Sequence, residues 1–173
     1  MNRKYIEIQP LFIWFLLAIM ILILPGCSQG HKGKKVIGET AQISLTDGDI
    51  KYLARIDTGA RITSVHALDV KVAESSPDKQ DNIGKLVTFN TENEKGVRKQ
   101  VTSKIMDVAK VRNAQGVEYR YVVDLNLNWQ GMDKSGHVNL RDRSAMSYKL
   151  LIGRNWLSDD FVVDVNKSEG IIK

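Results

Sequence analysis

Cysteine is almost absent from this chain of 173 residues, which holds one, Cys27, and proline occurs only three times. A single cysteine excludes an internal disulfide, so the folded part must be stabilised by the packing of apolar side chains. The chain has one long apolar run, from Leu11 to Leu24, and this run is shorter than the ~20 residues that a membrane-spanning helix needs. The rest of the chain is large enough for one hydrophobic core and too small for two.

Two motifs of metal and nucleotide chemistry are missing as well. No HExxH occurs, which excludes the zinc-protease helix, and no G-x-x-x-x-G-K-[ST] occurs, which excludes a P-loop. His66 and His137 remain as possible metal ligands beside an aspartate, although isolated histidines are more often structural or surface residues. We therefore expect no metal and no other cofactor. The net charge of +5 does not indicate nucleic acid, because no basic stripe interleaved with aromatic residues accompanies it.

The pattern of residues 1–26 is typical of a signal peptide. Arg3 and Lys4 precede the apolar run, which ends in Leu-Pro-Gly immediately before Cys27. This ending resembles a bacterial lipobox, whose cysteine is lipidated before the chain is cut, and Ser28 resembles the outer-membrane sorting preference. We expect a lipoprotein of the Gram-negative cell envelope, anchored in the membrane through Cys27, on the periplasmic side of the outer membrane. The alternative is an uncleaved signal anchor with an incidental cysteine.

Residues 27–35 form a polar, lysine-rich tether, whose positive charge favours an anionic membrane surface. From residue 36 to the C-terminus apolar and polar residues alternate, which is the periodicity of β-strands. An Asp-Gly pair at residues 47–48, between the runs 36–45 and 50–56, predicts a hairpin. Further expected elements are a hairpin around 91–96, strands at 117–127, 150–152 and 161–165, and one short helix near 154–160. The sequence thus predicts an all-β domain over residues 36–173.

The stretch ARIDTGARITSVHA, residues 54–67, contains the strongest candidate for catalysis. Asp57 follows a predicted strand, Gly59 lets backbone amides approach its carboxylate, and Thr58 offers a hydroxyl group. Asp and Gly are also common in ordinary turns, so the motif alone leaves both interpretations open. If two such turns meet, their carboxylates cannot both ionise, so one carries a proton and the other activates water. Only one DTG occurs, so the second aspartate must come from another copy.

Asp57-Thr58-Gly59-Ala60 resembles the active-site turn of retroviral-type aspartic proteases, the retropepsins. Their second landmark, an apolar pair before Gly-Arg-Asn and a short helix, is similar to LIGRNWL at residues 151–157. With the IGE opening at residues 37–39 and NLRDRSAMSYKLLIGRNWL at 139–157, these motifs resemble a bacterial family of retropepsin-like proteins. Its members are often labelled ATP-dependent zinc proteases and are associated with ATP-grasp ligases of the ribosomal-modification type.

The resemblance implies a retropepsin-like acid-protease barrel with one short C-terminal helix. It also implies a homodimeric aspartic endopeptidase that hydrolyses a peptide or protein substrate. The residues that it assigns are Asp57, Thr58 and Gly59 to catalysis, and Ala60, Gly153, Arg154 and Asn155 to structural or dimer support. The alternative is a non-catalytic periplasmic binding module that kept the barrel, because neither candidate flap turn, 91–96 or 113–116, is rich in glycine.

Two further features have open interpretations. Asp142-Arg143-Ser144 is either a binding loop that faces the site or a salt-bridged turn, and the structural interpretation is favoured. Trp129 and Trp156 are interpreted as core or interface residues rather than as a platform for substrate.

Overall fold

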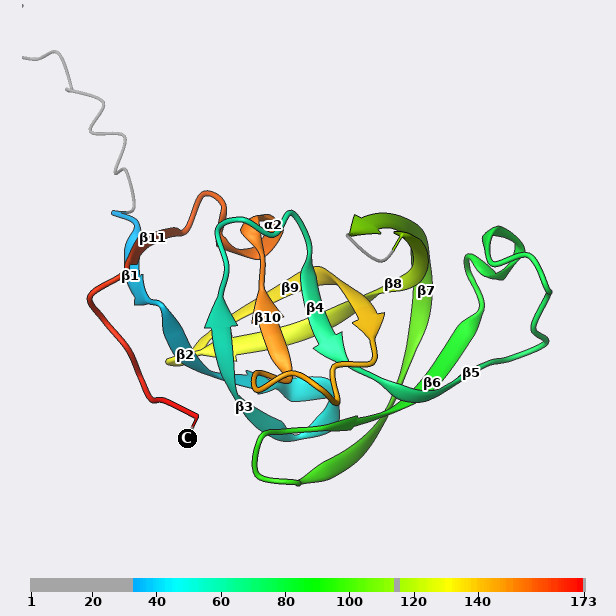
Figure 1. Cartoon of the computed structure of the whole chain (residues 1–173), viewed down its shortest axis with the longest axis horizontal. Coiled ribbons are helices and arrows are strands. Elements are labelled where there is room, and N and C mark those ends of the chain that lie inside the picture. The colour runs from blue at the N-terminus through cyan, green and yellow to red at the C-terminus, as the bar shows by residue number, and fades with distance from the viewer. Residues whose placement is uncertain (1–32, 114–115, 173) are drawn as a thin grey trace, which may run out of the picture. The chain divides into compact units, whose positions relative to one another are not determined.

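The computed structural model describes residues 33–113 and 116–172, which are mostly β-strand (Figure 1). The predicted all-β class and retropepsin-like fold are confirmed. The predicted signal peptide and the lipidation site at Cys27 lie outside the described residues, as does most of the tether. Within the described part of the chain, no helix is long and apolar enough to cross a membrane.

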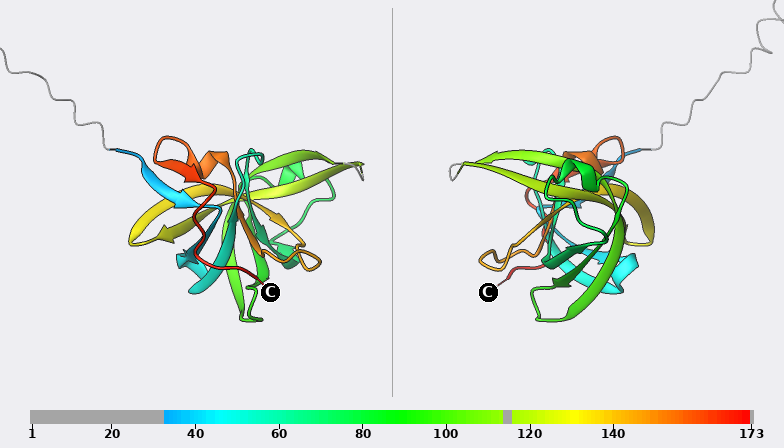
Figure 2. Two further views of the ribbon diagram at one scale, coloured as in Figure 1. Left: turned by 60° about the vertical axis from the view of Figure 1, so that its left-hand side comes forward. Right: turned by 90° about the vertical axis from the view of Figure 1, so that its right-hand side faces the viewer.

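The long central strands follow the period-two pattern of the sequence, and short polar turns separate them. The described elements in chain order are β1 (Lys35–Gly38), β2 (Thr40–Leu45), η1 (Thr46–Gly48), β3 (Ile50–Ile56), β4 (Thr63–His66), β5 (Leu68–Val72), η2 (Gln80–Asn82), β6 (Leu86–Glu92), β7 (Arg98–Asn113), β8 (Gly116–Trp129), β9 (Met132–Arg141), β10 (Leu150–Ile152), α2 (Arg154–Leu157) and β11 (Phe161–Asp164). The two longest strands, β7 and β8, form a hairpin whose outer part projects from the sheet as an arm (Figure 2).

The strands β2 to β10 form one sheet in the order β2-β3-β10-β4-β9-β8-β7-β6-β5. Since β2 pairs with β3 on one side and with the end of β8 on the other, six of these strands close into a barrel. β10 lies between β3 and β4, so the segment that follows it, at residues 153–155, is next to the turn that joins these two strands. β1 and β11 form a separate parallel pair.

The core fills the barrel with the inward-facing side chains of the alternating strands. Ile43, Tyr52, Leu125 and Ile152 are each almost fully buried, and burial of such a side chain stabilises the fold by roughly 1.5–3 kcal/mol. Trp156 is fully buried and stacks on Phe161 with 4.8 Å between ring centroids, while Trp129 meets the same ring edge-on at 5.4 Å. Both tryptophans therefore belong to the core, as predicted.

The structure corrects several details of the strand pattern. The predicted run 36–45 is two strands, because β1 pairs with β11 and β2 with β3, and the Glu39 N–H between them donates to Lys167 O at 2.7 Å. The predicted helix is a single turn. The sequence does not predict β4 and β9. All four residues of β4 are buried, although three are polar, so the strand lacks alternation.

Candidate active site

Asp57 follows β3 directly, on the turn toward β4 at the upper edge of Figure 1. Its backbone N–H donates to Ile152 O of β10 at 2.9 Å, which fastens the turn to the barrel. Its Oδ1 accepts the N–H groups of Gly59, at 2.8 Å, and of Ala60, at 3.2 Å. A Cβ on residue 59 would lie 3.1 Å from that oxygen, so glycine permits the close approach. No residue in the described ranges hydrogen-bonds Oδ2, which leaves this oxygen for a ligand.

The segment Gly153-Arg154-Asn155 holds the Asp57 turn from inside the same chain. Arg154 donates to three successive carbonyls of the turn: Nη1 to those of Thr58 and Gly59, at 2.9 and 3.2 Å, and its N–H to that of Ala60, at 2.9 Å. The predicted catalytic and support residues thus lie together.

Asn155 and Gly153 fix the start of β4. Asn155 Oδ1 accepts both the N–H of Thr63, at 2.8 Å, and its hydroxyl, at 3.0 Å. The Thr63 hydroxyl oxygen in turn accepts the Gly153 N–H at 3.1 Å. A Cβ on Gly153 would lie only 2.7 Å from the backbone carbon of Ile62, so this position requires glycine. Together with Arg154, these contacts hold the backbone of the turn that carries the carboxylate.

A cleft of about 390 Å³ opens beside Asp57. One of its walls is the arm, through Ala109 to Arg112 of β7 and Arg120 of β8. Asp57 is the one acidic residue among the lining residues, and the basic ones are Arg61, Lys110, Arg112, Arg120, Arg141 and Arg143. Such a surface attracts anions, and its cations reinforce one another within a confined space.

Two of these arginines are buried. Arg120, 6 % exposed, donates from Nε and Nη2 to Glu118 Oε2 at 2.8 and 2.5 Å, and this hydrogen bonding lowers the pKa of Glu118. Arg143, 5 % exposed, donates from Nε to Tyr148 O at 3.0 Å, and no described residue accepts from its two Nη groups. Burial, with Arg141 and Arg120 nearby, lowers the pKa of Arg143 to about 10, so it is still charged at neutral pH.

The loop 142–149, between β9 and β10, presents Arg143. Its N–H donates to Nδ1 of the buried His66 at 2.8 Å, so His66 accepts there. Burial foremost, and then Lys149, lowers the pKa of His66, which keeps the ring neutral. Lys149 Nζ donates to the carbonyls of Arg143, Ser144 and Met146 at 3.2, 2.8 and 2.9 Å. Of the predicted segment 142–144, therefore, Asp142 is part of the turn and Arg143 lines the cleft.

The other predicted candidates lie outside the cleft. His137 is exposed and pairs with Asp124 at 2.9 Å, and no group of three metal-binding side chains occurs among the residues that the structure describes. Of the candidate flaps, the turn after β6 is at the lower edge of Figure 1, away from Asp57. Thr91 there shares a 2.7 Å hydrogen bond with Tyr52. The other candidate flap, 113–116, joins β7 to β8, the two strands of the arm that borders the cleft. Residues 114–115 are outside the described ranges.

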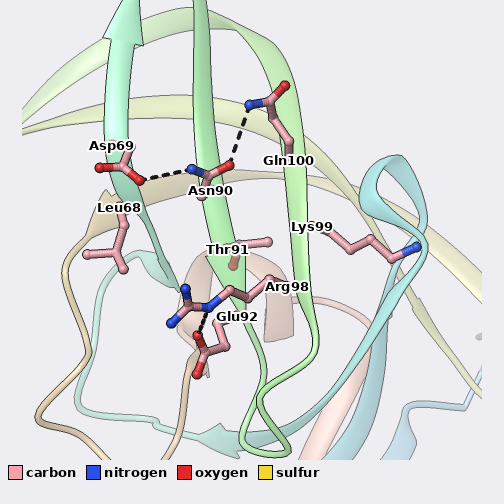
Figure 3. Close-up of a pocket in the computed structure, with 8 residues that line it drawn as sticks. All are labelled: Leu68, Asp69, Asn90, Thr91, Glu92, Arg98, Lys99 and Gln100. Atoms are coloured by element: carbon pink, nitrogen blue, oxygen red, sulfur yellow. Dashed lines mark hydrogen bonds and ion pairs between the residues drawn. The ribbon is translucent and has the colours of Figure 1, made fainter.

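A second hollow, between β5, β6 and β7, does not include Asp57 (Figure 3). Asn90 Nδ2 donates to Asp69 Oδ2 at 2.9 Å, Arg98 pairs with Glu92, and Lys99 is 3.8 Å from Asp49. The charged side chains of this hollow thus have partners in the protein, unlike the Nη groups of Arg143.

The sequence does not predict most of the cations that line the cleft. Lys110 and Arg112 look like the polar half of an alternating strand, and Arg120 looks the same. Ser64 and Asn139 also line the cleft, joined by a 3.0 Å hydrogen bond, and both belong to the strands that the sequence does not predict. The dense run RDR at 141–143 is the one local signal that could have indicated an anion site.

Comparisons with known proteins agree with this geometry. Residues 36–173 match the family model described as retropepsin-like aspartic endopeptidase RimB. A solved structure of a protein of unknown function from Legionella pneumophila superimposes with a TM-score of 0.63 and 25% identity, over 77% of this chain and 95% of that one. Curated relatives named "Probable alpha-L-glutamate ligase" are 29% identical over 119 residues in Shewanella halifaxensis and 27% over 138 residues in Desulfotalea psychrophila. The matched regions cover 66% and 76% of this chain but only 25% and 28% of those proteins, so the chain spans about a quarter of their length.

Proposed function

The chain belongs to the family of the retropepsin-like aspartic endopeptidase RimB, and from this premise we propose that it is an aspartic endopeptidase for carboxylate-rich polypeptides. Its active site would be completed when two copies place their Asp57 side chains together. The observation that carries the proposal is the position of Asp57, on a braced turn beside a cleft lined by six cations.

The proposed chemistry needs two carboxylates that share one proton. One Asp57 accepts a proton from a water molecule, which attacks the carbonyl carbon of the peptide bond, while the protonated partner donates its proton to the carbonyl oxygen, giving a gem-diol. The first Asp57 then donates the proton that it gained to the amide nitrogen, the partner takes a proton back from a gem-diol hydroxyl, and the C–N bond breaks to release a carboxylic acid and an amine. Two carboxylates close enough to share a proton do not both ionise readily, so the pair titrates with two separate pKa values. Activity requires a pH between these two pKa values. The hydrogen bonds to Oδ1 from Gly59 and Ala60 keep the carboxylate oriented without occupying Oδ2.

The substrate class follows from the charge of the cleft. A neutral or basic peptide would gain nothing from six cations, whereas a polypeptide with several carboxylates would neutralise them. The names of the glutamate-ligase relatives are consistent with a glutamate-containing partner protein, although they refer to proteins four times as long.

The place of action is proposed from the sequence. A lipid on Cys27 would hold the domain at the outer membrane, on the periplasmic side, through a tether that ends near residue 35. Metabolic labelling with a fatty-acid analogue tests this point: the wild type should be labelled and Cys27→Ser should not. Equal labelling of the two would refute the lipoprotein.

The test of catalysis uses the full-length chain and peptides that contain glutamate or glutamine at matched positions, between about pH 3 and pH 8. Wild type should cleave the glutamate peptides with a bell-shaped pH profile, and Asp57→Asn should not cleave them. A chelator should leave the rate unchanged, because the proposed mechanism uses no metal. Cleavage that survives Asp57→Asn, or that the chelator abolishes, would refute the mechanism. Tight binding without cleavage at any pH would favour a binding module instead.

A further inference from the structure

Arg143 carries a charge that the folded chain does not neutralise. Its side chain is buried, and two neighbouring arginines, Arg120 and Arg141, repel it. Arg120 has Glu118 as a partner, whereas the one opposite charge that raises the pKa of Arg143 is that of Asp57, with no hydrogen bond between them among the described residues. The two Nη atoms are not fully buried, so they meet solvent at the cleft and can donate there to a ligand. The arrangement therefore indicates a ligand that bears a negative charge.

The loop that carries Arg143 is ordered by contacts that place the guanidinium rather than neutralise it. His66 holds its backbone N–H, Tyr148 O holds Nε, and Lys149 ties three carbonyls of the loop together. The two Nη groups are left in a fixed fork at the wall of the cleft, a geometry that suits the two oxygens of a carboxylate. Because the fork is fixed before a ligand arrives, little conformational entropy is lost on binding.

We propose that Arg143 is the specificity-determining residue of the cleft, that it binds one carboxylate of the polypeptide beside Asp57, and that His66 is its positioning residue. This inference rests on the proposed endopeptidase activity, which it deepens by assigning one subsite. The bound carboxylate has two possible sources, a glutamate or aspartate side chain and the free C-terminus of the polypeptide. Both offer the same planar pair of oxygens, so the experiment must separate them.

The cleavage test measures kcat/KM for a set of otherwise identical peptides in which a single glutamate replaces glutamine at each position in turn. The full-length wild type should prefer glutamate most strongly at one position. Arg143→Gln should reduce that preference at least about tenfold, since a hydrogen bond to a charged group is lost, and should leave the other positions unchanged. Arg143→Lys, which keeps the charge and loses the fork, should retain part of it. Arg98→Gln removes one charge outside the cleft and should change nothing.

The source of the carboxylate is read from peptides with an amidated or a free C-terminus. If the Arg143-dependent preference for glutamate is seen in amidated peptides, Arg143 binds the glutamate side chain. If the preference is seen only in peptides with a free C-terminus, Arg143 binds the C-terminal carboxylate. A preference that Arg143→Gln leaves intact, or a loss spread evenly over all positions, would overturn the assignment. The even loss is what a merely structural role of the loop would produce.

The positioning role is tested with His66→Ala and His66→Asn. Alanine removes the acceptor for the Arg143 N–H and should reproduce the loss of preference, whereas asparagine, whose Oδ1 replaces Nδ1, should restore it. The same preference for glutamate in His66→Ala and His66→Asn would overturn the positioning role of His66.

A binding measurement separates the inference from the proposed function. The probe is fluorescent hexaglutamate with an amidated C-terminus, and the protein is full-length Asp57→Asn with and without Arg143→Gln. Arg143→Gln should weaken binding at least about tenfold. If wild type proves unable to cleave any peptide, this measurement still decides the role of Arg143, and unchanged affinity would overturn it.

Discussion

The two walls of the cleft are built in opposite ways. On the Asp57 wall, nearly every polar group that orients the turn has a partner within the chain: Arg154 donates to three carbonyls, and Asn155 accepts two hydrogen bonds from Thr63. The other wall is formed by the arm, the end of β9 and the loop 142–149; Arg120 and Arg141 lie near Arg143 there, and the two Nη groups of Arg143 have no partner among the described residues. The polar groups of the first wall are thus paired before a ligand binds, whereas the open donors of the second wall are paired only when an anion binds. We infer that the first wall supports chemistry and the second selects substrate.

The largest expected effect comes from breaking the completed wall. Asn155→Ala leaves the Thr63 N–H and hydroxyl without their acceptor in a part-buried place, and should lower the free energy of unfolding by about 2–3 kcal/mol. Cleavage should fall by more than about tenfold, because the turn loses its orientation. Chemical denaturation and peptide cleavage measure the two effects. The control is Ser158→Ala, at the exposed end of α2. An Asn155→Ala chain as stable as the wild type would show that the brace does not hold the turn.

A smaller effect is expected from removing the negative charge that pairs with a cation of the second wall. Glu118→Gln removes the charge that partly neutralises Arg120, and should tighten the binding of hexaglutamate by roughly two- to fivefold at low salt. The gain should disappear in high salt, because partly exposed charges are screened. Asp133→Asn removes the same charge on β9, outside the cleft, and is the matched control. Weaker binding by Glu118→Gln would mean that the pair with Arg120 shapes the site rather than competing with the ligand.

The smallest effect concerns pH and the link between His66 and the second wall. The pKa of His66 is lowered in the folded chain, by burial first, then by Lys149 and Arg143 against the opposing Asp142 and Glu92. Above its ordinary value of 6.5 the ring is neutral in both the folded and the unfolded chain, so it adds no pH dependence there. Below that value the unfolded chain takes up a proton that the folded chain resists, so stability should fall as the pH falls. Denaturation of His66→Asn should show a shallower decline than wild type; equal slopes would contradict the account.

The difference between the two walls also decides which part of the site the sequence predicts. The completed wall depends on contacts between two short, specific motifs, DTGA at 57–60 and GRN at 153–155, so the residues themselves indicate the site. The cationic wall depends on where long strands cross. Lys110, Arg112 and Arg120 each look like ordinary exposed positions of alternating strands. The pairing of β7 with β8 brings them together, and the closed barrel places them in one cleft with Asp57.

The two strands that the sequence does not predict have a physical reason in common. β4 is covered on both faces, so Ser64 and His66 are as buried as Val65, and their polar groups are satisfied by Asn139 and Arg143 rather than by water. β9 is exposed at its start and buried at Asn139, where it passes beneath the cleft. Buried polar residues that serve a site do not follow the pattern of apolar alternation, so periodicity alone cannot find such strands.

The central claim is that one Asp57 from each of two copies forms the active site, and mixing tests it most directly. Full-length wild type and full-length Asp57→Asn are unfolded together, refolded at varied ratios with constant total chain, and assayed on the preferred glutamate peptide. If a site needs two wild-type chains, activity should follow the square of the wild-type fraction, so that an equal mixture keeps about a quarter of full activity. Activity that falls only in proportion to the wild-type fraction, to about one half, would contradict the shared site.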